Sequence, residues 1–524
     1  MQRWLNRFGI ALLLLAALAS IIQVIWRAKA DADPQQITIR ICHWQLESGL
    51  REAYDEVARA YMALHPNVKI VQLPVPGRFY GTYTATQIVG EDPPDLIQLG
   101  SSISDAALAD YYVPLSRYVE EPNPYNKGTP LEGVAWRDTF KSGLARAPGV
   151  DRMMEYFAVP SIEVTGRMYC NLPLYEKVMG HRNPPRNYRE FLDVCERTTA
   201  YAKTHQLKLM PIAGSRFNAN VLLDRLFRSQ TQKLALQRDP LDTLSTPSLL
   251  AFVGNRTSLD DPAIRSGMAI MREVAGYMSP GFMQFDRDDA IFHFGQGRAL
   301  MIMTGSWDYG SIVTQSNFEI GVFDMPMPGP DDPVYGPYTL GPTTESGVGA
   351  GGGLGLTNAS PNRETAVDFI RFLTSVRGNQ MFVNRAKWLP SVRYVEVPPE
   401  VRAFAQRADG YPDGFAIAPI MWGSGEVYRL QSNNLHLLFD REGSVQKFAD
   451  AMQTGITSAV AADLTRQVRG YRDNVARFDA EHAALLQLPP STQRLSQLRE
   501  LQTAQEVHWL WLLRESRPAA KGAN

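Results

Sequence analysis

The stretch ITIRICHWQLESGLREAYDEVARAYMALHPNVKIVQLPV, residues 37–75, contains two hydrophobic periods in succession. Three isoleucines alternate with polar residues at its start, which predicts a strand over residues 36–44 with one buried face. Apolar residues then recur at spacings of three and four, which predicts an amphipathic helix over residues 48–65 that Pro66 ends. Residues 68–75 return to a strand pattern, so the order is strand, helix, strand.

The same alternation continues along the chain. Residues 82–90 are expected to form a short helix, and residues 95–99 a buried strand. A βαβαβ order predicts a parallel or mostly parallel sheet covered by helices. Ligands bind such sheets beyond the carboxyl ends of the strands. Residues 43–45 and residues 98–102 follow two strand ends, which makes them candidate ligand-binding positions.

A second block of alternating elements covers about residues 157–326. A helix is expected to begin at Asp261-Pro262, because aspartate caps helices and proline suits the first helical position. The chain becomes glycine-rich from Gly347, and a helix follows Pro361. Strands are expected over residues 157–159, 167–171, 299–304, 320–324 and 354–357.

The last part of the chain is expected to be helical. Residues 444–488 fit one or two helices, which Pro489 and Pro490 end. Residues 491–513 fit a final helix with an aromatic end, which either packs on the preceding unit or lies at a membrane surface.

Composition limits the classes of function. The 524 residues suggest about three domain-sized units, and 53 basic residues balance 54 acidic ones. A net charge of −1 gives no electrostatic footprint for nucleic acid. Three cysteines are too few for a disulfide scaffold; they are most simply buried small hydrophobes, and pairing of Cys170 with Cys195 stays open.

The N-terminus predicts export. Basic residues in the first seven positions precede an apolar run over residues 8–26, and Ala28-Lys29-Ala30 resembles a signal-peptidase site. The run is also close to the ~20 residues that span a bilayer. Residues 1–30 are therefore a signal peptide or an uncleaved membrane anchor, and both place the rest of the chain outside the cytoplasm, in the periplasm or anchored to the cytoplasmic membrane.

Motifs for other chemistries are missing from the sequence. The glycine-rich residues 349–355 lack the Gly-Lys-Ser/Thr ending of a phosphate loop, and no two of the eight histidines have metal-ligand spacing. No G-x-S-x-G nucleophile motif occurs. We expect no cofactor, no metal and no enzymatic activity. A glycosidase stays an open alternative, because its two carboxylates can come from distant segments.

Four stretches resemble the extracellular solute-binding proteins (family 1) of ABC importers, the group of maltose-binding protein. The resemblance covers about residues 37–480. The stretches are residues 37–69, GEDPPDLIQ at 90–98, FGQGRALMIMTGSW at 294–307, and the region from GGGLGL at 351–356 to Ser375.

The resemblance implies a two-lobed, type II periplasmic-binding-protein-like α/β fold, with a hinge and a cleft between the lobes. Lobe one would hold residues 37–155 and 348–392, and lobe two residues 156–347 and 393–488. Residues 489–524 extend beyond the family pattern as a helical C-terminal extension.

The implied function is capture of a carbohydrate, in particular an oligosaccharide, and its delivery to the transmembrane subunits of an ABC permease. The alternatives are a membrane-tethered sugar sensor and a carbohydrate-active enzyme.

The expected site combines aromatic and amide side chains. Aromatic faces stack on sugar rings, while amides, carboxylates and backbone groups bind hydroxyls. In similar proteins the tryptophan at the position of Trp307 contacts the sugar, although a packed core tryptophan is the plain alternative. The other candidates each have a structural alternative as a cap, turn, core or hinge residue: Trp44, Gln45, Gln98, Ser101, Ser102, Asp308, Glu163, Gly352 and Gly353.

Overall fold

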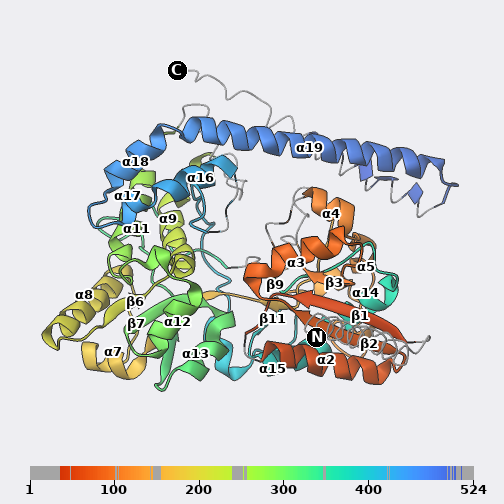
Figure 1. Cartoon of the computed structure of the whole chain (residues 1–524), viewed down its shortest axis with the longest axis horizontal. Helices are drawn as coiled ribbons and strands as arrows, with labels where there is room; N and C mark the ends of the chain where they lie inside the picture. The colour runs from red at the N-terminus through yellow and green to blue at the C-terminus, as the bar shows by residue number, and fades with distance from the viewer. Residues whose placement is uncertain are drawn as a thin grey trace, which may run out of the picture.

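The computed structural model describes residues 36–509, apart from residues 48, 101, 102, 104, 142, 145–154, 239–251, 253–256, 346–349, 422, 424 and scattered positions after residue 491. Two α/β lobes lie side by side (Figure 1). Each lobe is built on a four-stranded sheet, with strand order β10-β3-β1-β2 in lobe one and β6-β7-β5-β8 in lobe two.

The sheet of lobe one is mostly parallel, as predicted. Strands β1 (Ile37–His43), β2 (Val68–Pro74) and β3 (Leu96–Gln98) are parallel, and β10 (Leu354–Leu356) pairs antiparallel with β3. The carboxyl ends of β1, β2 and β3 therefore share one edge with the start of β10.

Helices from distant parts of the sequence pack into the core of lobe one, among them α2 (Leu50–Leu64), α14 (Arg363–Leu373) and α15 (Val376–Ala386). Tyr54 and Tyr61 of α2 are buried in this core, as the helical spacing predicts. Leu64, which the same spacing placed on the buried face, is half exposed because it lies in the last turn of the helix.

The sheet of lobe two is mixed. Strand β5 (Gly166–Asn171) lies between β7 (Ala299–Gly305) and β8 (Ile320–Phe323) and is antiparallel to both, while β6 (Met210–Ala213) is parallel to β7. Helices cover both faces of this sheet: α9 (Arg216–Arg238), α11 (Pro262–Ala275), α12 (Arg287–Gly295) and α13 (Tyr309–Gln315). Asp261 caps α11 as predicted, since its side chain accepts a hydrogen bond from the Ala263 amide at 3.0 Å.

A small third sheet joins the lobes. Strand β4 (Ile162–Glu163) pairs with β9 (Ala350–Gly351) on one side and β11 (Leu389–Pro390) on the other. The strand expected at residues 157–159 is wrong, because only Val159 forms an isolated bridge there. The chain crosses between the lobes at this sheet, which lies where the predicted hinge would be.

Gly352 follows the hinge strand β9 and has a φ of +62°. A Cβ atom at this position would lie 2.5 Å from Ser161 Oγ. Both the backbone conformation and the close approach of Ser161 therefore require glycine.

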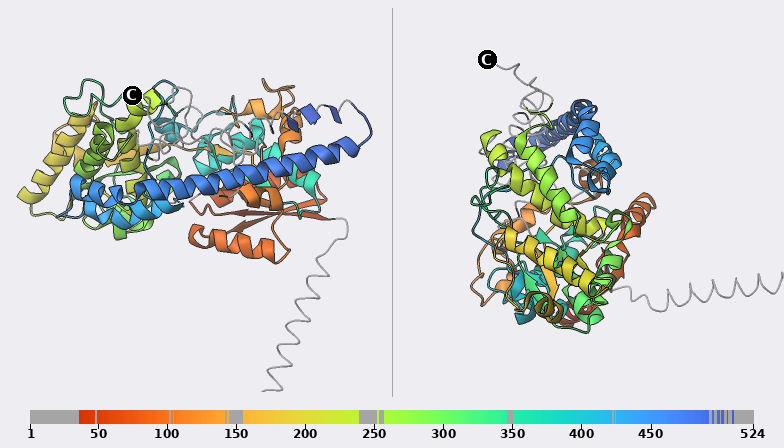
Figure 2. Two further views of the ribbon diagram at one scale, coloured as in Figure 1. Left: turned by 90° about the horizontal axis from the view of Figure 1, so that it is seen from above. Right: turned by 90° about the vertical axis from the view of Figure 1, so that its left-hand side faces the viewer.

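The C-terminal helices follow the predicted boundaries. Helices α18 (Val445–Gln453) and α19 (Ile456–Gln487) end before Pro489. The first turns of α19 pack on the core of lobe two, and α19 then runs along the length of the molecule above both lobes (Figures 1 and 2). Most of residues 489–524 lie outside the described residues, so the expected helical extension is not tested.

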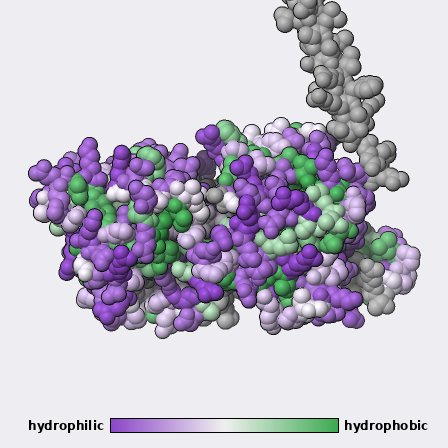
Figure 3. Space-filling view, turned by 90° about the horizontal axis from the view of Figure 1, so that it is seen from below, coloured by the Kyte–Doolittle hydropathy of each residue, from purple (hydrophilic) through white to green (hydrophobic). Residues whose placement is uncertain are grey.

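The N-terminal segment, residues 1–30, also lies outside the described residues. Across the part of the chain that the structure describes, no helix is long and apolar enough to cross a membrane. Figure 3 shows apolar residues in small separate groups between polar ones on the face seen there.

The structure shows whether Cys170 and Cys195 form a disulfide. Cys42, Cys170 and Cys195 are all buried and free. The alternative of a disulfide between Cys170 and Cys195 is therefore wrong, and both thiols belong to the apolar core of lobe two.

Candidate ligand site between the lobes

The strand ends of the two lobes face each other across the hinge. In lobe one, Gln98 at the end of β3 pairs with Leu354 at the start of β10. In lobe two, the end of β7 at Gly305 pairs with the start of β5 at Gly166. Because Gly166 and Leu354 each follow a hinge strand within three residues, both edges lie next to the hinge.

Trp307 connects the two lobes. It lies on the short 3-10 turn Ser306–Asp308 that follows β7, and its ring packs against the core of lobe one. A Cβ atom on Gly305 would lie 2.3 Å from this ring, so the preceding glycine makes room for it. Phe217 meets the indole edge-on at 6.2 Å between ring centroids. The indole Nε1 is buried and has no hydrogen-bond partner among the described residues.

Asp308 is completely buried beside Trp307. Its Oδ2 accepts a hydrogen bond from Thr304 Oγ1 at 2.5 Å, and Arg287 Nη2 lies 3.2 Å from its Oδ1. Burial raises the pKa of Asp308 to about 6, although Arg287 and the Thr304 hydroxyl oppose that rise. The carboxylate is thus a strong acceptor that is costly to keep charged.

An ion pair joins the lobes next to Asp308. Glu47 lies in the loop after β1, and its Oε1 accepts a hydrogen bond from Arg287 Nη2 at 3.2 Å. The other carboxylate oxygen of Glu47 is buried without a partner in the described chain. The Arg287 guanidinium also lies over the Phe217 ring, 5.5 Å from its centroid.

Sequence reasoning missed Glu47, Arg287 and Phe217. At the start of α12, Asp289 Oδ2 accepts a hydrogen bond from the Asp286 amide at 3.0 Å and caps the helix. Arg287 lies between these two residues in the sequence, and its ion pair depends on Glu47 of the opposite lobe. No local sequence signal marks a pair of residues that are 240 positions apart.

Two amide side chains line the edge of lobe one. Gln98 is only 1% exposed, and neither its Oε1 nor its Nε2 has a partner among the described residues. Gln45 is 7% exposed, and its Oε1 is likewise unpartnered there. Tyr80 donates to the backbone oxygen of Gln98 at 2.8 Å, and Trp44 stands edge-on to Tyr80 at 5.0 Å. The structure therefore gathers three of the predicted residues at this edge.

His43, which precedes Trp44, has structural contacts instead. Its ring stacks on Tyr54 at 4.8 Å, and its Nε2 lies 3.1 Å from Gln72 Oε1. Burial lowers the pKa of His43, so the imidazole is neutral at physiological pH.

The remaining predicted residues lie at the hinge or outside the described residues. Glu163 is a buried residue of β4. The Gly352 oxygen accepts from Ser161 Oγ at 3.1 Å, and the Gly353 oxygen accepts from the Leu99 amide at 2.8 Å, so both carbonyls are already occupied. Ser101 and Ser102 are not described.

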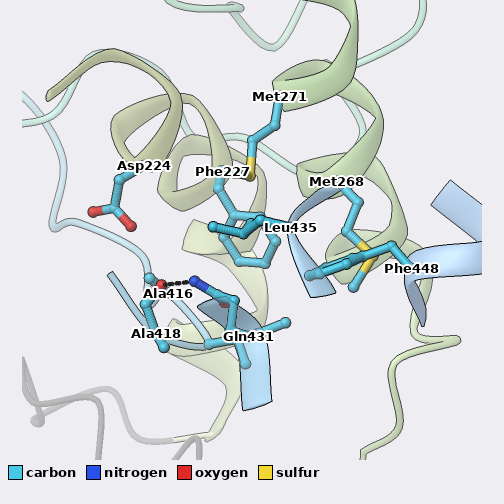
Figure 4. A pocket seen from close by; sticks show the side chains of 10 residues that line it. Asp224, Phe227, Met268, Met271, Ala416, Ala418, Gln431, Leu435 and Phe448 are labelled. Atoms are coloured by element: carbon cyan, nitrogen blue, oxygen red, sulfur yellow. Dashed lines mark hydrogen bonds between the residues drawn. The ribbon is translucent and has the colours of Figure 1, made fainter. Parts of the chain in front are cut away.

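Two other cavities lie away from these edges. The larger, of about 380 Å³, belongs to lobe one and is lined by Ile88, Glu91, Pro93, Asp110, Tyr111, Asn358 and Ala359. A cavity of about 10 Å³ between α9, α11 and α16 (Gly425–Asn434) holds one water at most (Figure 4). Its walls are mostly apolar, with Asp224 and Gln431 at the rim. Among the described residues, no group of three His, Cys, Asp or Glu side chains could hold a metal. The facing lobe edges are the candidate site, because predicted residues and buried polar atoms without partners in the described chain lie together there.

Sequence comparison identifies a family and one relative. Residues 56–406, more than half of the chain, match the family described as bacterial extracellular solute-binding protein. An uncharacterized ABC transporter extracellular-binding protein of Pyrococcus horikoshii is 20% identical over 300 residues, which cover 55% of this chain. The chain spans 60% of the length of that curated relative.

Several solved structures share the fold. A chitin oligosaccharide binding protein has a TM-score of 0.57 at 18% identity, covering 82% of this chain and 100% of its own. The GacH receptor of Streptomyces glaucescens has a TM-score of 0.55 at 14% identity, covering 81% and 99%. The maltose-bound MalE3 of T. maritima has a TM-score of 0.54 at 16% identity, covering 80% and 99%. These similarities establish the two-lobed α/β fold.

Proposed function

Because the chain belongs to the bacterial extracellular solute-binding proteins, we propose that it captures a carbohydrate between its two lobes and delivers it to an ABC permease. The ligand is an oligosaccharide in this proposal, and no covalent chemistry is involved. The names of the structural neighbours support the ligand class, since they include receptors for chitin oligosaccharides, acarbose and maltose.

The observation that carries the proposal is a set of buried polar atoms without protein partners. Buried polar groups in folded proteins are nearly always hydrogen-bonded, because an unpaired one costs ~1–3 kcal/mol. Here several occur on the facing edges of both lobes within the described chain: Gln45 Oε1, Glu47 Oε2, Gln98 Oε1 and Nε2, and Trp307 Nε1. A polyhydroxyl ligand offers donors and acceptors for all of them.

Each candidate residue has a proposed role. The indole of Trp307 stacks on a sugar ring, with Trp44 as a second aromatic wall. Gln45 and Gln98 bind hydroxyls, and Asp308 accepts hydrogen bonds from them. We assign Glu163, Gly352 and Gly353 to the hinge, on the contacts described above, and Ser101 and Ser102 keep their proposed role as ligand contacts.

The domain division is part of the same proposal. Residues 37–155 and 348–392 make lobe one, and residues 156–347 and 393–488 make lobe two. The packing of α14 and α15 into the core of lobe one supports this division. Binding energy would then shift an open–closed equilibrium of the two lobes. The protein acts outside the cytoplasm, with residues 8–26 as either a cleaved signal or a tether.

Calorimetric titration of the exported protein with mono- and oligosaccharides tests this function. We expect saturable binding, recovery of the ligand intact, and at least a ~10-fold loss of affinity in Trp307→Ala. Trp136→Phe is the matched control, because Trp136 lies in the core of lobe one and its indole donates to Thr374. If no sugar binds the folded protein, the carbohydrate assignment is wrong.

A further inference from the structure

We propose that Arg287 is a positioning residue that couples closure of the lobes to the ligand site, by bridging Glu47 of lobe one and Asp308 of lobe two. The inference goes beyond sugar binding, because it concerns the open–closed equilibrium of the protein alone.

The geometry makes Arg287 the shared partner of two carboxylates. Its Nη2 lies 3.2 Å from Glu47 Oε1 and 3.2 Å from Asp308 Oδ1. Arg287 and Asp308 both belong to lobe two, so their contact is independent of the hinge. The contact with Glu47 is different, because it joins segments of opposite lobes and exists only when the lobes are close.

The surroundings make this contact worth more than a surface ion pair. Asp308 is completely buried, and the Glu47 side chain is 11% exposed. Phe217 covers the guanidinium from one side. Exposed ion pairs contribute little because water and salt screen them, whereas close charge pairs that are shielded from water contribute several times more.

The remaining charge near the bridge is negative. Asp288 follows Arg287 and is almost fully exposed, and it is the other charged neighbour of both Arg287 and Asp308 in the described chain. A single guanidinium therefore serves two nearby carboxylates. Opening the cleft removes Glu47 from Arg287 but leaves Asp308 neutralised, so the bridge can break without stranding a buried charge.

The bridge also connects to the ligand site. Asp308 is adjacent to Trp307 in the chain, and the second oxygen of Glu47 has no partner among the described residues. Arg287 thus holds one carboxylate on each side of the cleft in a fixed place. Closure of the two lobes and the positioning of Glu47 and Asp308 at the ligand site therefore occur together.

The test measures lobe separation in the full chain without added sugar. Labels on Glu52→Cys in α2 and Lys177→Cys in α7 (Leu172–Met179) report the distance between exposed positions of the two lobes. The three native cysteines are buried, and burial raises the pKa of their thiols, so labelling is confined to the new ones.

We expect Arg287→Gln to lower the closed-to-open ratio about tenfold. Glu47→Gln should give a similar shift, and Arg287→Lys a smaller one, since it keeps the charge. Arg182→Gln is the matched control, because it removes an arginine that pairs with Glu176 and Glu319 inside lobe two.

A double-mutant cycle separates coupling from general damage. If Glu47 acts through Arg287, adding Glu47→Gln to Arg287→Gln changes the ratio no further. Additive effects, an unchanged ratio in Arg287→Gln, or an equal shift in Arg182→Gln would each overturn the proposal. The result does not depend on sugar titration, so failure of the bridge and failure of the proposed function are distinguishable.

Discussion

Two buried glutamines show how differently the interior of lobe two and the facing edge of lobe one are built. Gln232 of α9 is 2% exposed, and its Oε1 accepts from Thr339 Oγ1 and the Leu340 amide, while its Nε2 donates to the Pro412 oxygen. Gln98 is equally buried, but its amide has no partner in the described chain. A side-chain amide whose hydrogen bonds are all made within the protein has a structural role. A buried amide without such partners is suited to hydrogen-bond a ligand.

The charged clusters around Glu345 and Glu47 differ in the same way. In lobe two, Glu345 receives bidentate hydrogen bonds from Arg167 at 2.7 and 2.8 Å, and a further one from the Arg407 amide at 2.8 Å. Both carboxylate oxygens are occupied, and the cluster fixes the segments around residues 345 and 407 to β5. Where the lobes meet, Glu47 has one occupied oxygen, and its partner belongs to the other lobe.

The largest expected effect is on the occupied cluster. Glu345→Gln should lower the free energy of unfolding by ~3–5 kcal/mol, because the buried Arg167 loses its bidentate partner and keeps only one carboxylate among the described residues, Asp324, whose Oδ1 lies 3.9 Å away. Glu47→Gln, the matched change where the lobes meet, should cost at most ~1.4 kcal/mol, the equivalent of a tenfold shift in the closed-to-open ratio, since Arg287 keeps Asp308. Urea denaturation of both variants measures this, and equal losses would remove the distinction between the clusters.

A second effect is the pH dependence of stability, which has opposite sign in the two clusters. Burial raises the pKa of Asp308 to about 6, so the folded state holds a proton there that the unfolded state releases above pH 4. Stability should fall by up to ~3 kcal/mol as the pH rises from about 4 to 6. Burial acts to raise the pKa of Glu345, but the hydrogen bonds and charge of Arg167, the Arg407 amide and the charge of Arg225 together lower it, so its contribution is instead lost at acid pH.

Asp308→Asn isolates the Asp308 effect. Unfolding free energies of this variant and the unmodified protein should diverge with rising pH between about 4 and 6, with the variant the more stable one at pH 7. Glu345→Gln supplies the comparison, because its deficit should shrink as the pH falls. Parallel profiles for Asp308→Asn and the unmodified protein would contradict the assigned cause.

Sequence patterns were sufficient for elements whose signal is local. The period of two in residues 37–43 and the helical spacing after it predicted β1 and α2, and the apolar run at residues 299–304 predicted β7. The hinge strand β4 was missed, because two residues carry no period and its pairing partners are more than 180 positions away. Arg287 was missed for the same reason, since its partner Glu47 comes from a segment of the other lobe.

The smallest expected effect is the difference in stability between Gln232→Leu and Gln98→Leu. This pair tests the comparison most directly, because the same substitution is made at two equally buried positions. Gln232→Leu should lower the unfolding free energy by ~2–3 kcal/mol, since it strands the donors and acceptors around residues 339–341 and 412. Gln98→Leu removes an amide without bonds to lose, so we expect no loss of stability, or a gain of up to ~1 kcal/mol. If carbohydrate binding is weakened in Gln98→Leu while folding is not, the unpaired amide serves the ligand. A loss of stability as large as that of Gln232→Leu would instead mean that Gln98 makes structural bonds inside lobe one.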